Sequence, residues 1–343
     1  MHSVLIVDDS ALTRKILRET IGKHSGFSVA DYATNGEDAL EKVKKLDPDV
    51  ITLDIEMDKL NGLEFLERLM DEYPKPVVIV SSHAEDESQI TFDALERGAV
   101  DFLLKPKNLN LREEFEEFKE ALLSKLEAAL QSKPKLMQKK KKKVVHKFKK
   151  PAKHIVIFGA STGGPSTLKR LFSELPGELP FSMLVVQHMP LGFTKPFAEH
   201  LDKISDFNVK EAVHNEEIED NTAYICPADY HMVLYENSNT GKYFIKLTKT
   251  EKVHGVRPSF DVLVKSVVPI FKERVIMVVL TGMGKDGLAG ARLVNESKGK
   301  VLVESEDSCI IYGMPKAIAE ENLADAVVSL EKLPVSIVQE VDN

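Results

Sequence analysis

The sequence predicts an α/β protein built from two doubly wound domains whose sheets are wholly or mostly parallel. Short apolar, β-branched runs alternate with amphipathic helical patterns in both halves of the 343-residue chain. That length corresponds to two domains, or to three. Residues 131–153 separate the halves, and they hold 11 lysines and no acidic residue. A segment with so much like charge cannot bury a core, so we expect it to link two domains.

The charge of the chain is distributed unevenly. The net charge of −8 combines −12 on residues 1–130, +11 on residues 131–153 and −7 on residues 154–343. We interpret the basic block as a solvated linker; the alternative is a basic surface that contacts an acidic domain or an anionic membrane, a contact that salt would weaken. Two cysteines exclude a disulfide framework, and no apolar run approaches the ~20 residues of a membrane span. We therefore expect a cytoplasmic protein.

Five short apolar runs in the first half are predicted to form buried parallel strands. They are Val4–Val7, Ser28–Ala33, Val50–Leu53, Val77–Val80 and Phe102–Leu104. Amphipathic stretches predict the helices Ala11–Ile21, Gly36–Lys45, Gly62–Tyr73 and Glu87–Arg97, and a further helix from Leu111 to Leu130 leads into the linker. Ligands of such a sheet bind at the carboxyl ends of its strands.

Polar side chains stand at those strand ends. Asp8 and Asp9 follow the first strand and Asp54 follows the third. Carboxylates at one sheet edge repel one another unless a hard divalent cation such as Mg²⁺ neutralises them. Beside Mg²⁺, a central carboxylate can accept a phosphoryl group, which Lys105 and the Ser81 hydroxyl could then contact. Any one of these acids, read alone, is more often a turn or helix-cap residue.

The second half opens with a strand, a glycine-rich turn and a helix. His154–Phe158 is the strand, Gly159–Pro165 the turn and Ser166–Leu175 the helix. Such a turn can expose a serine nucleophile, here Ser161, or bind a phosphate at the helix N-terminus. The dinucleotide fingerprint GxGxxG and the P-loop GK[ST] are absent. The turn alone leaves both chemistries open.

Two later strands add a base and an acid. Ser182–Gln187 ends in His188, and Val275–Leu280 leads into a glycine-rich loop that ends at Asp286. With Ser161, these residues would form a nucleophile, a base and an orienting carboxylate at neighbouring strand ends. Read alone, Asp286 is instead an N-cap for the helix that follows it. The order Ser, His, Asp along the chain differs from that of α/β-hydrolases and of the two well-known serine protease folds.

The remaining histidines and cysteines are weaker candidates for chemistry. His200 is predicted to lie in a helix and His214 in a polar stretch, whereas His231 lies near a predicted strand start, where we expect a structural role. His254 is predicted to lie in a loop beside Arg257, where it could contact a substrate. Cys226 and Cys309 are far apart in the sequence and no CxxC or HExxH motif occurs, so we expect no zinc site.

Residues 1–122 resemble the receiver domain of bacterial response regulators, which has a flavodoxin-like, five-stranded parallel fold. The matching residues are Asp8, Asp9, Asp54, Ser81 and Lys105, with Phe102 at the aromatic switch position. The resemblance implies that a partner histidine kinase phosphorylates Asp54 in a reaction that requires Mg²⁺. It further implies Mg²⁺ ligands and switch residues: Asp8, Asp9, Asp54 and the Glu56 backbone carbonyl for the ion, and Ser81, Phe102 and Lys105 for the switch.

The second half resembles the catalytic domain of the chemotaxis protein-glutamate methylesterase (CheB) family. The resemblance depends on GASTGGP (159–165), VVQHMP (185–190), CPADYH (226–231), RPSFDVL (257–263) and LTGMGKDG (280–287). It implies that Ser161 is the nucleophile, His188 the base and Asp286 the carboxylate, with backbone N–H groups around Thr162 and Met283 at the oxyanion position. The implied organisation is a receiver over residues 1–122, a helical and then lysine-rich linker over 123–153, and a hydrolytic α/β domain over 154–343.

Together the two resemblances imply a phosphorylation-activated serine hydrolase. Its substrates would be glutamate methyl esters on cytoplasmic chemoreceptor helices, with glutamine deamidation as a second activity and no cofactor for hydrolysis. Its partners would be a chemotaxis histidine kinase and the receptors, through which alone it would approach the membrane. The alternative is a response regulator with a non-catalytic output domain that binds a ligand or partner. Specific nucleic-acid binding is disfavoured, because residues 154–343 are acidic and contain no helix-turn-helix pattern.

Overall fold

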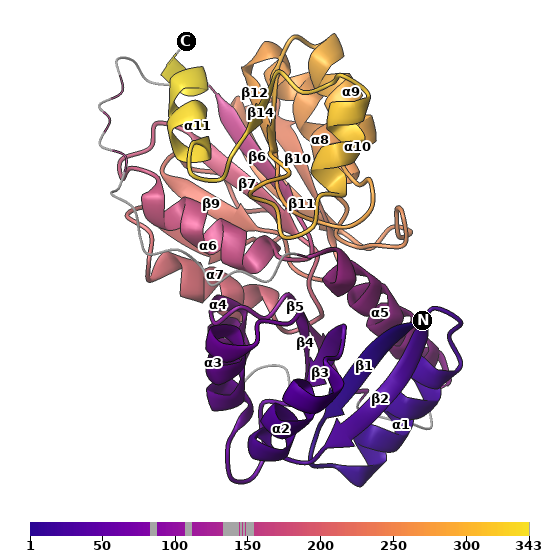
Figure 1. Cartoon of the computed structure of the whole chain (residues 1–343). Helices are drawn as coiled ribbons and strands as arrows, with labels where there is room; N and C mark the ends of the chain where they lie inside the picture. Colours follow the sequence, from indigo (N-terminus) through magenta and orange to yellow (C-terminus); the bar gives the residue numbers. More distant parts are fainter. Residues whose placement is uncertain are drawn as a thin grey trace. The chain divides into compact units, whose positions relative to one another are not determined.

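The computed structural model describes residues 1–82, 88–106, 112–132, 144, 146, 148 and 154–342. Contacts divide the chain into two units, Met1–Lys139 and Lys140–Asn343, each with its own sheet and core (Figure 1). The predicted class, two doubly wound α/β domains, is confirmed. The exact domain boundaries at residues 122 and 154 remain predictions. No helix in the described ranges combines the length and apolar character needed to cross a membrane.

The first unit contains the predicted five-stranded parallel sheet, with strand order β2-β1-β3-β4-β5. The strands are β1 (His2–Val7), β2 (Phe27–Ala33), β3 (Val50–Leu53), β4 (Val77–Ser81) and β5 (Asp101–Leu104). Every residue of β3 and β4 is buried, as expected for parallel strands that are covered on both faces by helices. The order places the ends of β1, β3 and β5 along one edge of the sheet.

Among the described residues of this unit, five helices accompany the sheet: α1 (Ala11–Gly22), α2 (Gly36–Leu46), α3 (Gly62–Glu72), α4 (Ser88–Glu96) and α5 (Arg112–Gln131). Three begin at side-chain caps, because Ser10, Asn35 and Asn61 each accept a hydrogen bond from an N–H group of the first turn. The predicted helices are confirmed to within a few residues. The predicted start of α4 at residue 87 and that of α5 at residue 111 lie outside the described residues.

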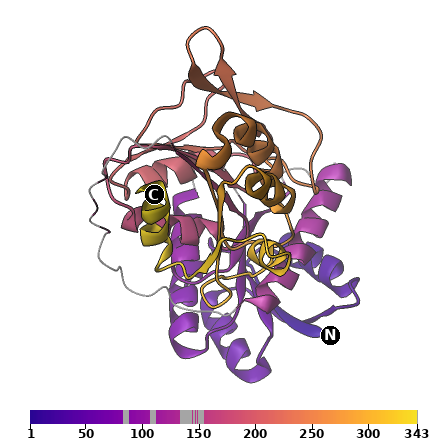
Figure 2. The ribbon, with the colours of Figure 1, turned by 90° about the horizontal axis from the view of Figure 1, so that it is seen from above.

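The second unit contains a seven-stranded sheet in the order β14-β13-β12-β6-β7-β9-β8. Its strands are β6 (Ile155–Ala160), β7 (Ser182–Gln187), β8 (Asn208–Glu211), β9 (Thr222–Ile225), β12 (Val275–Val279), β13 (Lys300–Glu304) and β14 (Ala326–Val328). All neighbouring strands of this sheet are parallel. An antiparallel hairpin, β10 (His231–Asn237) and β11 (Lys242–Thr248), lies beside α8 and its tip extends beyond the helices (Figure 2).

The described part of the second unit contains six α-helices: α6 (Gly164–Glu174), α7 (Thr194–Asp202), α8 (Phe260–Phe271), α9 (Leu288–Glu296), α10 (Met314–Glu320) and α11 (Leu333–Asp342). Alternation along β6 divides its side chains between two cores. Phe158 packs edge-on against Phe172 of α6, with ring centroids 5.7 Å apart. Ile155 and Ile157 belong instead to the cluster that buries the apolar face of α8.

Strand β6 is the topological switch point of this sheet. It pairs with β12 on one side and with β7 on the other, and all residues of the three strands are buried. The loops that leave β6, β7 and β12 at their carboxyl ends therefore meet over one short stretch of the sheet edge. In open α/β sheets this is where ligands bind.

Three described residues of the lysine-rich segment lie against the second unit. The Val144 N–H group donates to the Glu174 carbonyl at 2.9 Å, and the Phe148 ring meets Phe181 edge-on. The His146 Nε2 atom lies 2.9 Å from the Asp342 carboxylate. The expected solvated linker does not hold at these three positions, each of which is partly buried. The 11 lysines themselves lie outside the described residues, so the expectations about their contacts stay predictions.

Candidate active site

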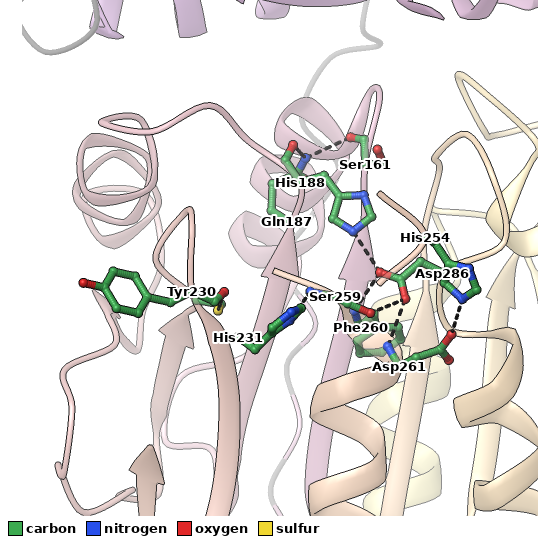
Figure 3. A network of polar contacts seen from close by, with 11 residues as sticks. Ser161, Gln187, His188, Tyr230, His231, His254, Ser259, Phe260, Asp261 and Asp286 are labelled. Carbon is green, nitrogen blue, oxygen red and sulfur yellow. Dashed lines mark hydrogen bonds and ion pairs between the residues drawn. The ribbon is translucent and has the colours of Figure 1, made fainter. Parts of the chain in front are cut away.

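The structure brings Ser161, His188 and Asp286 together at the carboxyl edge of the second sheet (Figure 3). Ser161 is the first residue after β6, and His188 is the first after β7. Asp286 lies in the loop between β12 and α9. Because β6 lies between β7 and β12, the serine is flanked by the histidine and the carboxylate. The predicted convergence of these three side chains is therefore present.

The histidine and the carboxylate are directly bonded. His188 Nε2 lies 2.9 Å from Asp286 Oδ2. A carboxylate only accepts hydrogen bonds, so Nε2 carries the hydrogen and Nδ1 carries a free lone pair. Nδ1 faces the Ser161 side of the site in Figure 3. This arrangement, with Nε2 on the acid and Nδ1 toward the serine, leaves the imidazole ready to accept a proton.

Asp286 is anchored at the N-terminus of α8. Its carboxylate accepts hydrogen bonds from the Ser259 hydroxyl at 2.8 Å, the Phe260 N–H at 2.7 Å and the Asp261 N–H at 3.0 Å. Burial acts to raise the pKa of Asp286, but His188 and these backbone donors outweigh it, so the pKa lies below its ordinary value. The reading of Asp286 as an N-cap of the following helix is wrong, because Gly287 is the N-cap residue of α9 and no side-chain hydrogen bond caps this helix.

The turn that carries Ser161 is held by backbone hydrogen bonds on both sides. The Ser161 N–H donates to the Thr281 carbonyl at 3.0 Å, and the Ser161 carbonyl accepts from the Gly164 N–H at 2.7 Å. The Gln187 amide donates to the Ser161 and His188 carbonyls, each at 2.9 Å. Sequence reasoning assigned no role to Gln187 or Thr281, although Gln187 ends one predicted strand and Thr281 directly follows another.

The glycine loop after β12 lies directly against the serine. A Cβ atom added at Gly282 would lie 2.8 Å from the Ser161 Cβ, so only glycine allows this close approach. The Thr281 hydroxyl donates to the Thr162 carbonyl at 3.0 Å, which joins the two loops. The backbone at Thr162 and Met283 therefore flanks Ser161 from two sides, which is a suitable arrangement for an oxyanion site.

A second histidine–carboxylate pair lies next to Asp286. His254 Nε2 donates to Asp261 Oδ2 at 3.1 Å, and the Gly290 N–H donates to the other oxygen of Asp261 at 2.7 Å. Burial raises the pKa of Asp261. The side-chain oxygens of Asp261 and Asp286 come close to the His254 ring, but protein donors already bond them. These residues therefore do not fit a metal site.

The structural role expected for His231 is confirmed. It is the first residue of β10 and is fully buried. The Ser259 N–H donates to its Nδ1 atom at 3.1 Å, and its Nε2 atom donates to the Glu251 carbonyl at 3.0 Å. His231 therefore fixes the residue that caps α8. Arg257, beside the cap, forms an ion pair with Asp229.

A separate polar site lies at the strand ends of the first unit. Lys105 Nζ lies 2.5 Å from Asp54 Oδ2 and 2.8 Å from Asp8 Oδ2. Both acids are buried, and burial raises the pKa of Asp8 and raises that of Asp54 to about 6, against the opposing effect of Lys105. One lysine therefore does not compensate the negative charge of this site.

This acidic site has room and ligands for a divalent cation. Oxygen atoms of Asp8, Asp9 and Asp54 lie within 4.8 Å of one another. Asp9, Asp54, Glu56 and Lys105 all line an open pocket. Carboxylate oxygens with access to water are the environment that Mg²⁺ prefers, and the uncompensated charge gives a reason to bind it.

The two predicted switch positions adjoin the acidic site in the fold. Ser81 is the last residue of β4 and Phe102 lies in β5, and both side chains are about 1% exposed. The Lys105 N–H donates to the Ser81 carbonyl at 2.7 Å. The predicted residues of the first unit are therefore gathered at one edge, and their roles remain predictions.

Comparisons with known proteins identify the family of each unit. Residues 156–337 match the family model for CheB methylesterase, and residues 4–115 match that for the response regulator receiver domain. The chain is 41% identical over 338 residues to a protein-glutamate methylesterase/protein-glutamine glutaminase of Thermotoga maritima, covering 98% of this chain and 97% of the relative. A relative of the same name from Pyrococcus horikoshii is 39% identical, with 99% and 93% covered.

A solved structure extends this likeness to the fold of the second unit. The crystal structure of the Thermotoga maritima CheB methylesterase catalytic domain matches with a TM-score of 0.53 and 42% identity. The match covers 54% of this chain and 97% of that domain. The family suggested by the sequence motifs is thereby confirmed: the chain belongs to the CheB methylesterase family and carries a response regulator receiver domain at its N-terminus.

Proposed function

We propose that this protein is a phosphorylation-regulated serine hydrolase that removes methyl groups from glutamate esters of chemoreceptors and deamidates their glutamines. One observation carries the proposal: a histidine that is hydrogen-bonded to a buried carboxylate stands beside Ser161 at adjacent strand ends. This is the arrangement that activates a serine for attack on a carbonyl carbon. The names of the relatives supply the substrate class.

The catalytic cycle follows from the positions of the three side chains. His188 Nδ1 takes the Ser161 proton while the serine oxygen attacks the ester carbonyl. Asp286 holds the imidazole through Nε2 and stabilises the imidazolium. Backbone N–H groups at Thr162 and Met283 are proposed to bind the oxyanion. His188 then protonates the departing methoxide or amide nitrogen, and water hydrolyses the acyl-enzyme by the same steps in reverse order.

The first unit is proposed to control this chemistry through Asp54. Its carboxylate would accept a phosphoryl group from a histidine kinase, with Asp8, Asp9, Asp54 and the Glu56 carbonyl holding Mg²⁺. When bound, Mg²⁺ neutralises phosphoryl charge. Lys105, which already contacts Asp54, would then pair with a phosphoryl oxygen.

The switch residues Ser81 and Phe102 are proposed to carry the signal onward. Ser81 would donate its hydroxyl to the phosphoryl group, and its carbonyl is already bonded to the Lys105 N–H group. Phe102 is buried in β5, the strand that leads to Lys105. We propose that the unphosphorylated receiver inhibits the hydrolase and that phosphorylation shifts the population toward an active arrangement.

Replacing Ser161 tests the hydrolase assignment. Ser161→Ala removes the nucleophile, so we expect methanol release from methyl-labelled receptor membranes to fall at least ~10³-fold. Ser166→Ala is the matched control, because Ser166 is buried in the first turn of α6 and its hydroxyl donates to the Gly163 carbonyl at 3.0 Å. It should keep activity within a few fold. Equal rates for wild type and Ser161→Ala would overturn the proposal.

Replacing Asp54 tests the regulation. A small phosphodonor such as acetyl phosphate with Mg²⁺ should stimulate methanol release by the wild type and should leave Asp54→Asn unchanged. Removing Mg²⁺ with a chelator should abolish the stimulation. The control is Asp71→Asn on the exposed side of α3, which should respond as the wild type does. A stimulated Asp54→Asn variant would disprove the role of Asp54 while leaving the hydrolase assignment intact.

The raised pKa of Asp54 predicts a pH-dependent effect on stability. Ionised Asp54 destabilises the folded receiver without Mg²⁺, so its contribution is most favourable below about pH 4 and is lost as pH rises through about 6. Asp54→Asn should therefore have a free energy of unfolding up to about 3 kcal/mol higher than wild type at pH 7.5, with a higher unfolding temperature, and the advantage should vanish near pH 4. Calorimetry with and without Mg²⁺ measures this, and adding Mg²⁺ should favour the wild type. An advantage independent of pH would contradict the assignment.

A further inference from the structure

The chain places a hub of buried hydrogen bonds directly beneath the nucleophile, centred on Thr281. The Thr281 carbonyl accepts from the Ser161 N–H at 3.0 Å. Its hydroxyl has two carbonyl acceptors in reach, Thr162 at 3.0 Å and Ile311 at 3.2 Å, of which Thr162 is the nearer, and it accepts from the Ile311 N–H at 2.8 Å. Thr281 is fully buried and directly precedes Gly282. It therefore joins the nucleophile turn to the loop on the other side of Ser161.

The third group of Thr281, its N–H, is held by a buried acid. Glu304 is the last residue of β13, the neighbour of β12, and its Oε2 atom accepts from the Thr281 N–H at 2.9 Å. Glu304 is fully buried, and its Oε1 atom has no hydrogen-bond partner among the described residues. Burying a carboxyl group with only one oxygen hydrogen-bonded costs free energy that an apolar residue would not, so its presence here points to the hydrogen bond with Thr281.

The protonation of Glu304 agrees with this placement. Burial raises its pKa to about 7, against the opposing effects of the Thr281 N–H, Ser308, Cys309 and Arg170. The group can thus be neutral near physiological pH while one oxygen still accepts the Thr281 hydrogen bond. Neither Glu304 nor Thr281 reaches the surface, so neither can contact a receptor.

We propose that Glu304 is a positioning residue of the hydrolase, acting through Thr281. Its carboxyl oxygen fixes Thr281, and Thr281 in turn fixes Ser161 and Thr162 relative to the Gly282–Met283 loop. This inference rests on the proposed function, because it assigns the two sides of the oxyanion site to these loops. Displacements of about 1 Å in such a site slow the chemical step strongly, whereas substrate binding at the surface is unaffected.

Two pairs of substitutions test the inference. Glu304→Met keeps the volume but removes the acceptor, and Glu304→Gln restores an acceptor oxygen. Thr281→Val removes the hydroxyl, and Thr281→Ser restores it. We expect Glu304→Met and Thr281→Val to lower kcat for methanol release roughly 10- to 100-fold with KM unchanged, as for loss of a buried hydrogen-bond partner. Glu304→Gln and Thr281→Ser should keep kcat within a few fold of wild type.

A destabilised control separates positioning from general loss of stability. Leu302→Ala removes a buried side chain from the same strand, β13, without removing a hydrogen-bond partner of either loop, so it should lower the unfolding temperature but keep kcat. All variants are assayed below their unfolding temperatures. Three results would each overturn the inference. The first is a loss of kcat proportional to the loss of stability across the set; the second is a kcat for Glu304→Gln as low as that for Glu304→Met; the third is a rise in KM in place of a fall in kcat.

A second readout keeps this inference separable from the substrate assignment. A fluorophosphonate probe reacts with an activated serine irrespective of receptor binding, so its rate at Ser161 should fall in Glu304→Met and recover in Glu304→Gln. If wild type labels rapidly but releases no methanol from receptors, the proposed substrate is wrong and the positioning role stands. If the labelling rates of wild type and Glu304→Met are equal, the positioning role is wrong.

Discussion

The hydrolase unit depends on one buried charge, the carboxylate of Asp286. An ionised carboxylate inside a protein is tolerated only where donors surround it, and here the N-terminus of α8 supplies two backbone N–H groups and the Ser259 hydroxyl. The fourth donor is His188, so the need to satisfy one acid orients the catalytic base. His231 holds the Ser259 N–H group, and thus connects the hairpin to the same helix start.

A few hydrogen bonds to the backbone of Ser161 position the nucleophile. The Ser161 N–H group donates to the Thr281 carbonyl, and the Ser161 carbonyl accepts from the Gln187 side-chain amide. Thr281 follows β12 and Gln187 ends β7, so both neighbouring strands hold the turn. Glycine at position 282 lets the adjoining loop approach within van der Waals contact. The reactive hydroxyl is therefore held at a rigid edge of the sheet. The Met283 side chain in the adjoining loop is exposed.

Much of the fold could be predicted because buried parallel strands are continuous apolar runs. Strands such as β6, β7 and β12 were recognisable for this reason, and the chemical side chains that follow them were found with them. Short or less apolar strands were not predicted, among them β8 and β14, whose pairing depends on tertiary contacts. The role of Asp286 at α8 in place of α9 also could not be read locally, because 25 residues separate it from Asp261. Glu304 was missed because its environment is created by packing, and the sequence marks it only as an acid after an apolar run.

Asp286 makes His188 a base by holding the hydrogen on Nε2. The most direct test is kcat for methanol release by Asp286→Asn, with unfolding temperature measured alongside. Asparagine removes the negative charge and one of the two acceptor oxygens, so the side chain no longer stabilises the imidazolium and no longer fixes the hydrogen on Nε2. We predict a fall in kcat of about 10⁴-fold, as for loss of the correct tautomer in a catalytic triad, in a variant that remains folded. A folded Asp286→Asn variant with kcat within tenfold of wild type would contradict the account.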